Sequence, residues 1–169
     1  MWLNKSLRHQ SGITTVEFAL IGSVLFVVLF GLIEFGRLLF TWNVLDEATR
    51  RAVRVAVVCP ITAVGQQFAR ETGAFGGTLL PDFTEANIVL SYLQEDGITL
   101  AAATEDTYYV RARIATLADE TAGLGTVYEH QMLIPFFNIT LDADAFETTL
   151  PTESLGVHPD GAGSAPCGP

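Results

Sequence analysis

The side chains that most often carry catalysis or bind metal ions are few and widely spaced in this sequence. The three histidines are His9, His130 and His158, and no pair of histidines or cysteines has the spacing of a zinc site. Ser154 lacks the flanking glycines of a nucleophile elbow, and no phosphate-binding loop is present. We therefore predict no catalytic residue, no metal site and no cofactor, and we expect that the protein is not an enzyme.

One ionisable residue does stand in an unusual place. Residues 18–33 contain no charge, and Glu17 directly precedes them. An apolar helix that is long enough to cross a bilayer must begin near Ile13, which puts Glu17 about one turn inside it. A carboxylate in lipid costs at least about 2.5 kcal/mol at mid-bilayer and less near the interface. The position of Glu17 therefore needs a physical explanation.

The apolar segment itself favours a membrane helix. It is apolar on every face, whereas a buried helix of a soluble domain usually has one apolar stripe. It also begins late for a secretory signal and is followed by Glu34 and Arg37 rather than by a small-residue cleavage site. We predict a transmembrane helix over residues 13–36.

Beyond residue 36 the pattern becomes amphipathic. The apolar positions recur every three or four residues, which places them on one helical face: Leu38, Trp42, Leu45, Ala48, Ala52, Val55 and Cys59. Asp46 and Arg50, and likewise Glu47 and Arg51, have the spacing of exposed ion pairs. We predict that one helix continues through residues 37–58 and ends at Cys59 and Pro60.

The rest of the chain predicts a small mixed domain. A short helix is expected at 62–72, and β-rich runs occur at 87–93, 97–102, 107–117, 132–141 and 145–151. The first two runs are expected to form a hairpin around Glu95, Asp96 and Gly97. The predicted fold is α+β: a long N-terminal helix, then a head at 59–155 with an antiparallel sheet, then an irregular Gly/Pro-rich tail at 156–169.

A set of motifs near the N-terminus resembles a known family. A short basic leader with Lys5 and Arg8 ends at Gly12, an aliphatic residue follows, and Glu17 comes five positions after the glycine. This pattern resembles a type IV prepilin cleavage site. With VEFAL at 16–20, GLIEFGR at 31–37 and the arginines at 51 and 54, residues 11–58 resemble the TadE-like family of pseudopilins. The family commonly has a proline near Gly22, which this chain lacks, so a proline-linked kink is in doubt.

The resemblance implies a processed protein. A prepilin peptidase would remove the leader, residues 1–12, by cutting between Gly12 and Ile13. The new amine at Ile13 would be cationic, and Glu17 would pair with the amine of a neighbouring subunit, which relieves the burial of both charges. The simpler reading of Glu17 is a residue in the headgroup zone. Glu34 and Arg37 can pair on one helical face, either as an interfacial anchor or as a subunit contact.

The resemblance also implies a cellular location, which bears on the state of the two cysteines. We expect a single-pass protein of the bacterial inner membrane, with a cytoplasmic N-terminus and a periplasmic head, while the count of positive charges on either side is not decisive. In an oxidising periplasm Cys59 and Cys167 would form a disulfide, although two unrelated free thiols remain the alternative.

Composition limits the partners. Nine Lys and Arg stand against 19 Asp and Glu, for a net charge of −10, so nucleic acid is not expected as a partner. The predicted function is a minor pilin or pseudopilin that assembles or primes a tight-adherence (Tad/Flp) pilus. Its partners would be the prepilin peptidase, other Tad pilins, the inner-membrane assembly platform and the membrane. Whether it enters the filament stays open. The alternative is an unprocessed, membrane-anchored periplasmic binding module.

Overall fold

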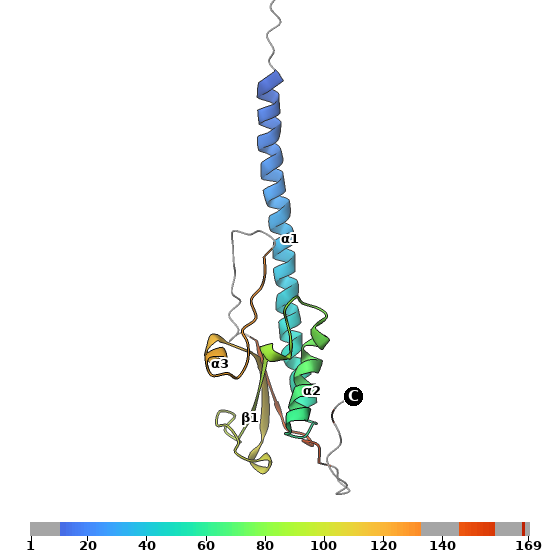
Figure 1. Cartoon of the computed structure of the whole chain (residues 1–169), viewed down its shortest axis with the longest axis vertical. Helices are drawn as coiled ribbons and strands as arrows, with labels where there is room; N and C mark the ends of the chain where they lie inside the picture. The colour runs from blue at the N-terminus through green and yellow to red at the C-terminus, as the bar shows by residue number, and fades with distance from the viewer. Residues whose placement is uncertain (1–10, 133–145, 158–166, 168–169) are drawn as a thin grey trace, which may run out of the picture. The chain divides into compact units, whose positions relative to one another are not determined.

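The computed structural model describes residues 11–132, 146–157 and 167 (Figure 1). The chain divides into two compact units, Met1–Leu38 and Leu39–Pro169. A single long helix, α1 (Ser11–Ala56), is followed by a small head with a three-stranded sheet and short helices. The predicted α+β fold is confirmed. The predicted leader, at residues 1–10, lies outside the described residues.

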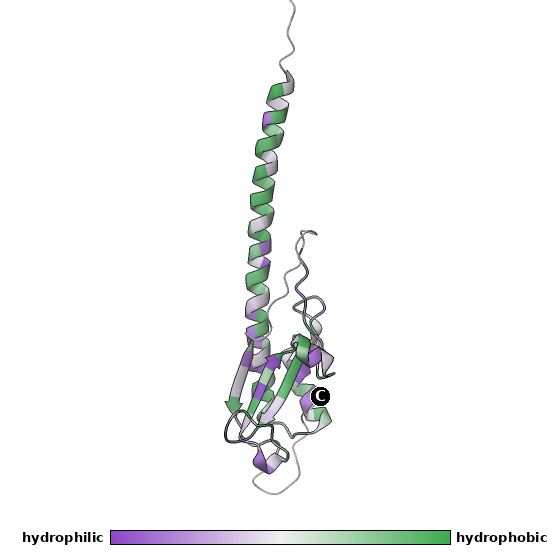
Figure 2. Cartoon of the chain, turned by 90° about the vertical axis from the view of Figure 1, so that its left-hand side faces the viewer, coloured by the Kyte–Doolittle hydropathy of each residue, from purple (hydrophilic) through white to green (hydrophobic). Residues whose placement is uncertain are grey.

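In the first unit α1 is an unbroken apolar helix. Its large apolar side chains are exposed from Ile13 to Ile33, with Phe18 at 77% of its maximal exposure, and the ribbon in Figure 2 is coloured as mostly hydrophobic there. The helix passes through Gly22 and Ser23, where the Ser23 hydroxyl donates to the Leu20 carbonyl at 2.8 Å. Within the described part of the chain, α1 is the one helix that is long and apolar enough to cross a membrane.

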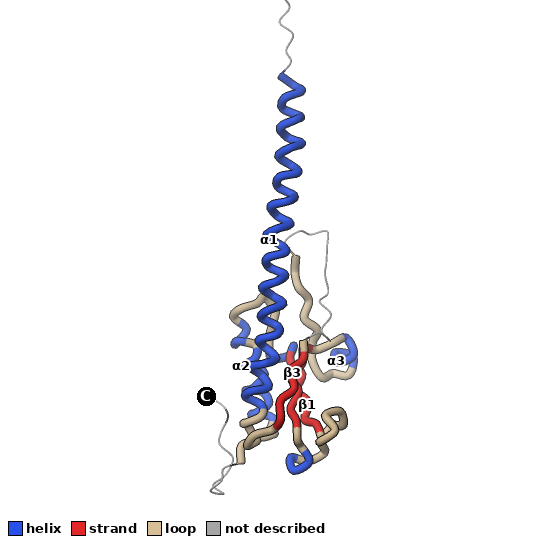
Figure 3. The backbone as a smooth tube through the Cα atoms, turned by 180° about the vertical axis from the view of Figure 1, so that it is seen from behind, coloured by secondary structure: helices blue, strands red, loops and turns tan. Residues whose placement is uncertain are grey.

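The head is built on an antiparallel sheet with the order β1–β2–β3. Its strands are β1 (Ile88–Leu93), β2 (Tyr109–Ile114) and β3 (Glu147–Pro151). Along β2, Val110, Ala112 and Ile114 are buried, whereas Arg111 and Arg113 lie on the opposite face, as the alternation predicts. Helices α1 and α2 (Ala63–Gly73) lie on one side of the sheet and α3 (Leu117–Thr121) lies on the other (Figure 3).

The buried side of α1 differs from the predicted stripe. Leu45, Ala48 and Ala52 are buried as expected, but Trp42 is 47% exposed and contacts the Phe146 ring edge-on at 4.7 Å. The core also takes α1 positions that the stripe omitted: Val44, Thr49, Val53 and Ala56. The reason is that the sheet and α2 together cover a wider arc of α1 than a single row of side chains spans.

Two strand predictions need correction or fall outside the described residues. Residues 97–102 form no strand, and the expected hairpin is reduced to one bridge between Leu93 and Leu100. The carboxylate of Asp96 accepts the backbone N–H groups of Ile98 and Thr99, which folds the chain locally instead of extending it. The expected strand at 132–141 lies almost entirely outside the described residues.

Other local predictions are confirmed, while most of the expected irregular tail at 156–169 lies outside the described residues. Helix α2 is present, and the Thr62 side chain caps it by accepting from the Gly65 N–H at 3.1 Å. Arg50 pairs with Asp46 at 2.9 Å, and Arg51 pairs with Glu47 at 3.1 Å. The three strands, α2 and the second half of α1 thus enclose one hydrophobic core.

Candidate functional site

The residues of the predicted cleavage site lie in the first turns of α1. Gly12 has no atom within 4 Å of where a Cβ would lie, apart from its own helix backbone, and Ile13 and Glu17 are both exposed. Four residues of helix separate Ile13 from Glu17, a rise of about 6 Å, or roughly one turn. The carboxylate of Glu17 therefore projects from a helix surface that is otherwise apolar.

This geometry defines what Glu17 is able to do. Ile13 and Glu17 lie on the same helical face because residues four apart are neighbours on a helix. An amine at Ile13 would be cationic at neutral pH, since an α-amino group has a pKa near 8. A carboxylate within reach of such an amine, from the same chain or from an adjacent one, allows two charges to enter lipid as a neutral pair.

Glu34 and Arg37 form the ion pair that their spacing predicts. The Arg37 guanidinium donates to both carboxylate oxygens of Glu34 at 3.2 Å. Glu34 is only 4% exposed, and the Arg37 side chain is about one third exposed. The buried Glu34 carboxylate and the Arg37 guanidinium together carry no net charge. A neutral pair suits the end of an apolar segment.

The two cysteines meet in the head. Cys59 and Cys167 form a disulfide with their Cα atoms 5.7 Å apart and a sequence separation of 108. The residues after β3 run back to the end of α1, where the N–H groups of Glu153 and Leu155 donate to the Val57 carbonyl and that of Gly156 donates to the Val58 carbonyl. The C-terminal part of the head therefore satisfies carbonyls at the end of the long helix.

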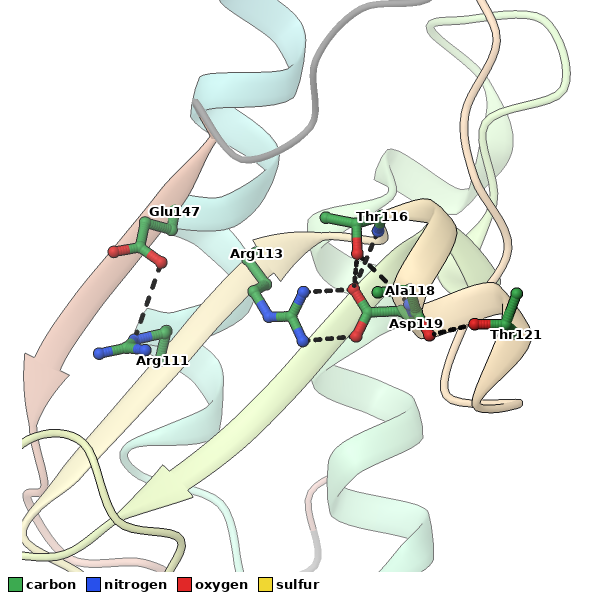
Figure 4. Close-up of polar contacts among 7 residues, drawn as sticks. All are labelled: Arg111, Arg113, Thr116, Ala118, Asp119, Thr121 and Glu147. Carbon is green, nitrogen blue, oxygen red and sulfur yellow. Dashed lines mark hydrogen bonds and ion pairs between the residues drawn. The ribbon is translucent and has the colours of Figure 1, made fainter.

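The head also contains contacts that sequence reasoning missed. Arg113 on β2 and Asp119 on α3 form a two-pronged ion pair in which both guanidinium NH₂ groups donate to the carboxylate (Figure 4). Burial alone would raise the pKa of Asp119, but hydrogen bonds from Arg113 and from the backbone and hydroxyl of Thr116 outweigh it and lower that pKa. Thr116 followed by an acid three residues later is a capping signal that the sequence does contain. No sequence pattern indicates that Arg113 is the partner of this acid.

A second missed contact joins His130 to α1. The His130 ring and the Thr41 hydroxyl are both buried, and the His130 Nδ1 lies 3.2 Å from Thr41 Oγ1. The sequence places these residues 89 positions apart, so no spacing rule connects them. This contact ties the segment after α3 to α1. It gives His130 a structural partner rather than a place in a catalytic group.

No cluster of three or more His, Cys, Asp or Glu side chains suited to a metal ion occurs among residues 11–132, 146–157 and 167. The residues that the sequence singled out also do not converge on one another. Gly12, Ile13 and Glu17 lie at the start of α1, and the disulfide lies beyond its end in the head.

Comparison with known proteins finds a family match for the helical part of the chain. Residues 12–54 match the TadE-like protein family. No curated protein and no solved structure matches the chain. The resemblance that the leader and helix motifs predict is thus confirmed for these residues.

The TadE-like match covers α1 almost to its end and stops before α2. It contains Gly12, Glu17, the Glu34–Arg37 pair and the arginines up to Arg54. The apolar half of this helix is consistent with a membrane anchor. The head after residue 54 lies outside the match.

Proposed function

We propose that this protein is a minor pilin or pseudopilin that assembles or primes a Tad pilus, and that a prepilin peptidase cuts it between Gly12 and Ile13. The observation that carries the proposal is the position of Glu17. It stands five residues after Gly12 and about one turn into an exposed apolar helix that matches the TadE-like family. A carboxylate there is costly unless a cation neutralises it.

Assembly supplies that cation. After cleavage, the amine of Ile13 on one subunit pairs with Glu17 of its neighbour, so that each charge loses most of its desolvation cost only when the helices pack together. An unassembled subunit keeps its carboxylate near the interface or protonated. The pair therefore favours assembly over dispersal in the membrane, which is the behaviour required of a pilin.

The same proposal fixes topology and partners. The leader lies on the cytoplasmic side of the inner membrane, where the prepilin peptidase cuts, α1 crosses once, and the head is periplasmic. The partners are other Tad pilins and the inner-membrane assembly platform. The Cys59–Cys167 disulfide supports an oxidising location for the head. We further propose that the protein is not an enzyme, consistent with ionisable side chains that serve packing contacts.

N-terminal mapping of the protein from cells tests cleavage directly. The mature chain is expected to begin at Ile13. Gly12→Leu should remain full length because a bulky residue does not fit the peptidase cleft, whereas Gly22→Leu, a second glycine of α1 with open space around it, should be processed normally. A native protein that begins at Met1 in cells with an active peptidase would instead support the unprocessed, anchored binding module.

Moving the carboxylate tests the role of Glu17. Glu17→Val should insert into the membrane and be cleaved, yet lower pilus number. The double variant Val16→Glu with Glu17→Val keeps one acid in the apolar segment but turns it about 100° around the helix. If position matters, this variant should be as defective as Glu17→Val. Wild-type pilus number in both variants would contradict the assembly role.

A further inference from the structure

The head carries two surfaces of opposite charge. After Pro60 the sequence contains 15 acidic residues and three arginines. Two of these arginines are engaged inside the head: Arg113 pairs with Asp119, and Arg111 donates to the Gly97 carbonyl at 2.9 Å and to the Thr149 hydroxyl at 3.2 Å. Most of the head surface is therefore negative, and free positive charge must come from elsewhere.

The positive charge comes from the outward side of α1. Arg50 and Arg54 on α1 and Val58 in the turn after it follow one another at four-residue intervals and are exposed, and we call them the arginine face. Arg50 makes an exposed pair with Asp46, which contributes little to stability. Arg54 makes no hydrogen bond or ion pair with any residue that the structure describes. The arginine face is thus a basic surface on which Arg50 is held only by an exposed pair.

The complementary surface is a groove on the head. Two adjoining pockets of about 550 and 370 Å³ share Glu120 and Thr126, so they form one depression. Four carboxylates line it and define the acidic groove: Asp82, Glu85, Glu120 and Glu129. Arg70 is the basic residue at its rim, and the exposed Leu124 supplies an apolar surface. Its shape and charge fit a helix that presents arginines and a small apolar side chain.

We propose that the arginine face of one copy docks in the acidic groove of a second copy. The charges are complementary, Val58 and Leu124 provide apolar contact, and the contact uses two different surfaces of the same chain. Such a contact is heterologous: each copy keeps a free face and a free groove, so the contact repeats along a row of subunits. It does not involve Gly12, Ile13 or Glu17, so its failure would leave the proposed cleavage and the role of Glu17 untouched.

Charge reversal on the full chain in detergent micelles tests the contact by sedimentation velocity. Wild-type protein should self-associate with rising concentration. Arg50→Glu with Arg54→Glu, and separately Glu85→Arg with Glu120→Arg, should each weaken association about tenfold or more, since like charges then face one another. Association should also weaken in about 1 M salt, where the screening length is about 3 Å.

Mixing the two variants gives the decisive result. The first variant keeps an intact groove and the second keeps an intact arginine face, and the two reversed surfaces are also opposite in charge, so the mixture should associate although each variant alone does so weakly. Glu95→Arg with Glu105→Arg is the matched control, because it makes the same charge change at exposed acids outside the groove and should leave association unchanged. All substituted side chains are exposed, and thermal unfolding should confirm that each variant folds.

Three results would overturn the proposal. The first is wild-type protein that stays monomeric at the highest concentration reached in micelles. The second is a control variant that weakens association as much as the groove variant does, which would mean that net charge alone governs it. The third is a mixture of the two reversed variants that fails to associate.

Discussion

Arg113 and Asp119 bind each other with two parallel hydrogen bonds across the join between β2 and α3, and the same carboxylate caps the start of α3 through Thr116. Asp119 is 3% exposed, so its charge is stabilised by these donors rather than by water. One carboxylate therefore holds the sheet, the short helix and the loop between them together.

Asp119→Asn should lower the free energy of unfolding by about 2 kcal/mol, because the amide cannot accept both guanidinium donors and leaves Arg113 without a counter-charge. The loss stays moderate because the Arg113 side chain is about one quarter exposed. Urea unfolding of the full chain in detergent, followed by Trp42 fluorescence, measures it. Glu120→Gln, at an exposed neighbour, is the control and should change little.

The same pair predicts a pH dependence. The pKa of Asp119 is lowered in the folded state, so the unfolded chain takes up this proton at a higher pH than the folded protein. Its contribution to stability is present above about pH 4 and is lost as the pH falls through the folded pKa. The stability difference between wild type and Asp119→Asn should therefore shrink in acid. A difference that is constant from neutral pH into strong acid would show that Asp119 is not ionised in the fold.

Tyr92 predicts a dependence of the opposite sign. Burial raises its pKa to about 12, partly offset by the charge of Arg70. The neutral phenol is thus favoured in the folded state, and stability should fall as the pH rises from about 10 to 12. Since one pKa unit corresponds to about 1.4 kcal/mol, the loss at Tyr92 is about 3 kcal/mol at most. Tyr92→Phe should flatten this part of the pH profile, whereas Tyr108→Phe, at an exposed tyrosine, should leave it steep.

Gly73 marks the closest approach of α2 to α1. A Cβ there would lie 2.7 Å from the Ala52 Cβ, 2.9 Å from the Ala48 carbonyl oxygen and 2.9 Å from the Ile88 Cδ1. Gly73→Ala should destabilise the head by about 1–3 kcal/mol, because the helices must separate to admit the methyl group. Gly36→Ala, at a helical glycine with open space, should not destabilise the protein. Equal stability of the Gly73 variant would mean that the two helices pack less closely.

The disulfide predicts a redox effect. Cys167→Ser opens a loop of 108 residues and should lower the free energy of unfolding by about 3 kcal/mol. On a non-reducing gel, wild type should run faster than this variant, and reductant should abolish the difference. Complete alkylation of unreduced wild-type protein would show that the thiols are free.

The sequence predicted best those helices and strands whose residues follow a local periodic pattern. The unbroken apolar run specified α1, and the alternation of Tyr109, Arg111 and Arg113 with buried neighbours specified β2. The short helix expected at 62–72 is α2, and Thr62 caps it. Each of these features depends on residues within one or two turns, which a pattern captures.

Patterns failed where distant segments decide the outcome. The width of the buried arc on α1 depends on how the sheet and α2 cover it, so Val44 and Val53 were missed. The hairpin expected after β1 does not form, because the Asp96 carboxylate accepts the backbone N–H groups of Ile98 and Thr99 and makes a turn there. The contacts between Thr41 and His130 and between Arg113 and Asp119 join different elements, and no spacing rule anticipates them.

The hydrogen bonds from Glu153, Leu155 and Gly156 to Val57 and Val58 have a consequence for biogenesis. The long helix is synthesised before the groups that finish its far end. A polypeptide that stops short of those groups leaves the Val57 and Val58 carbonyls without these donors.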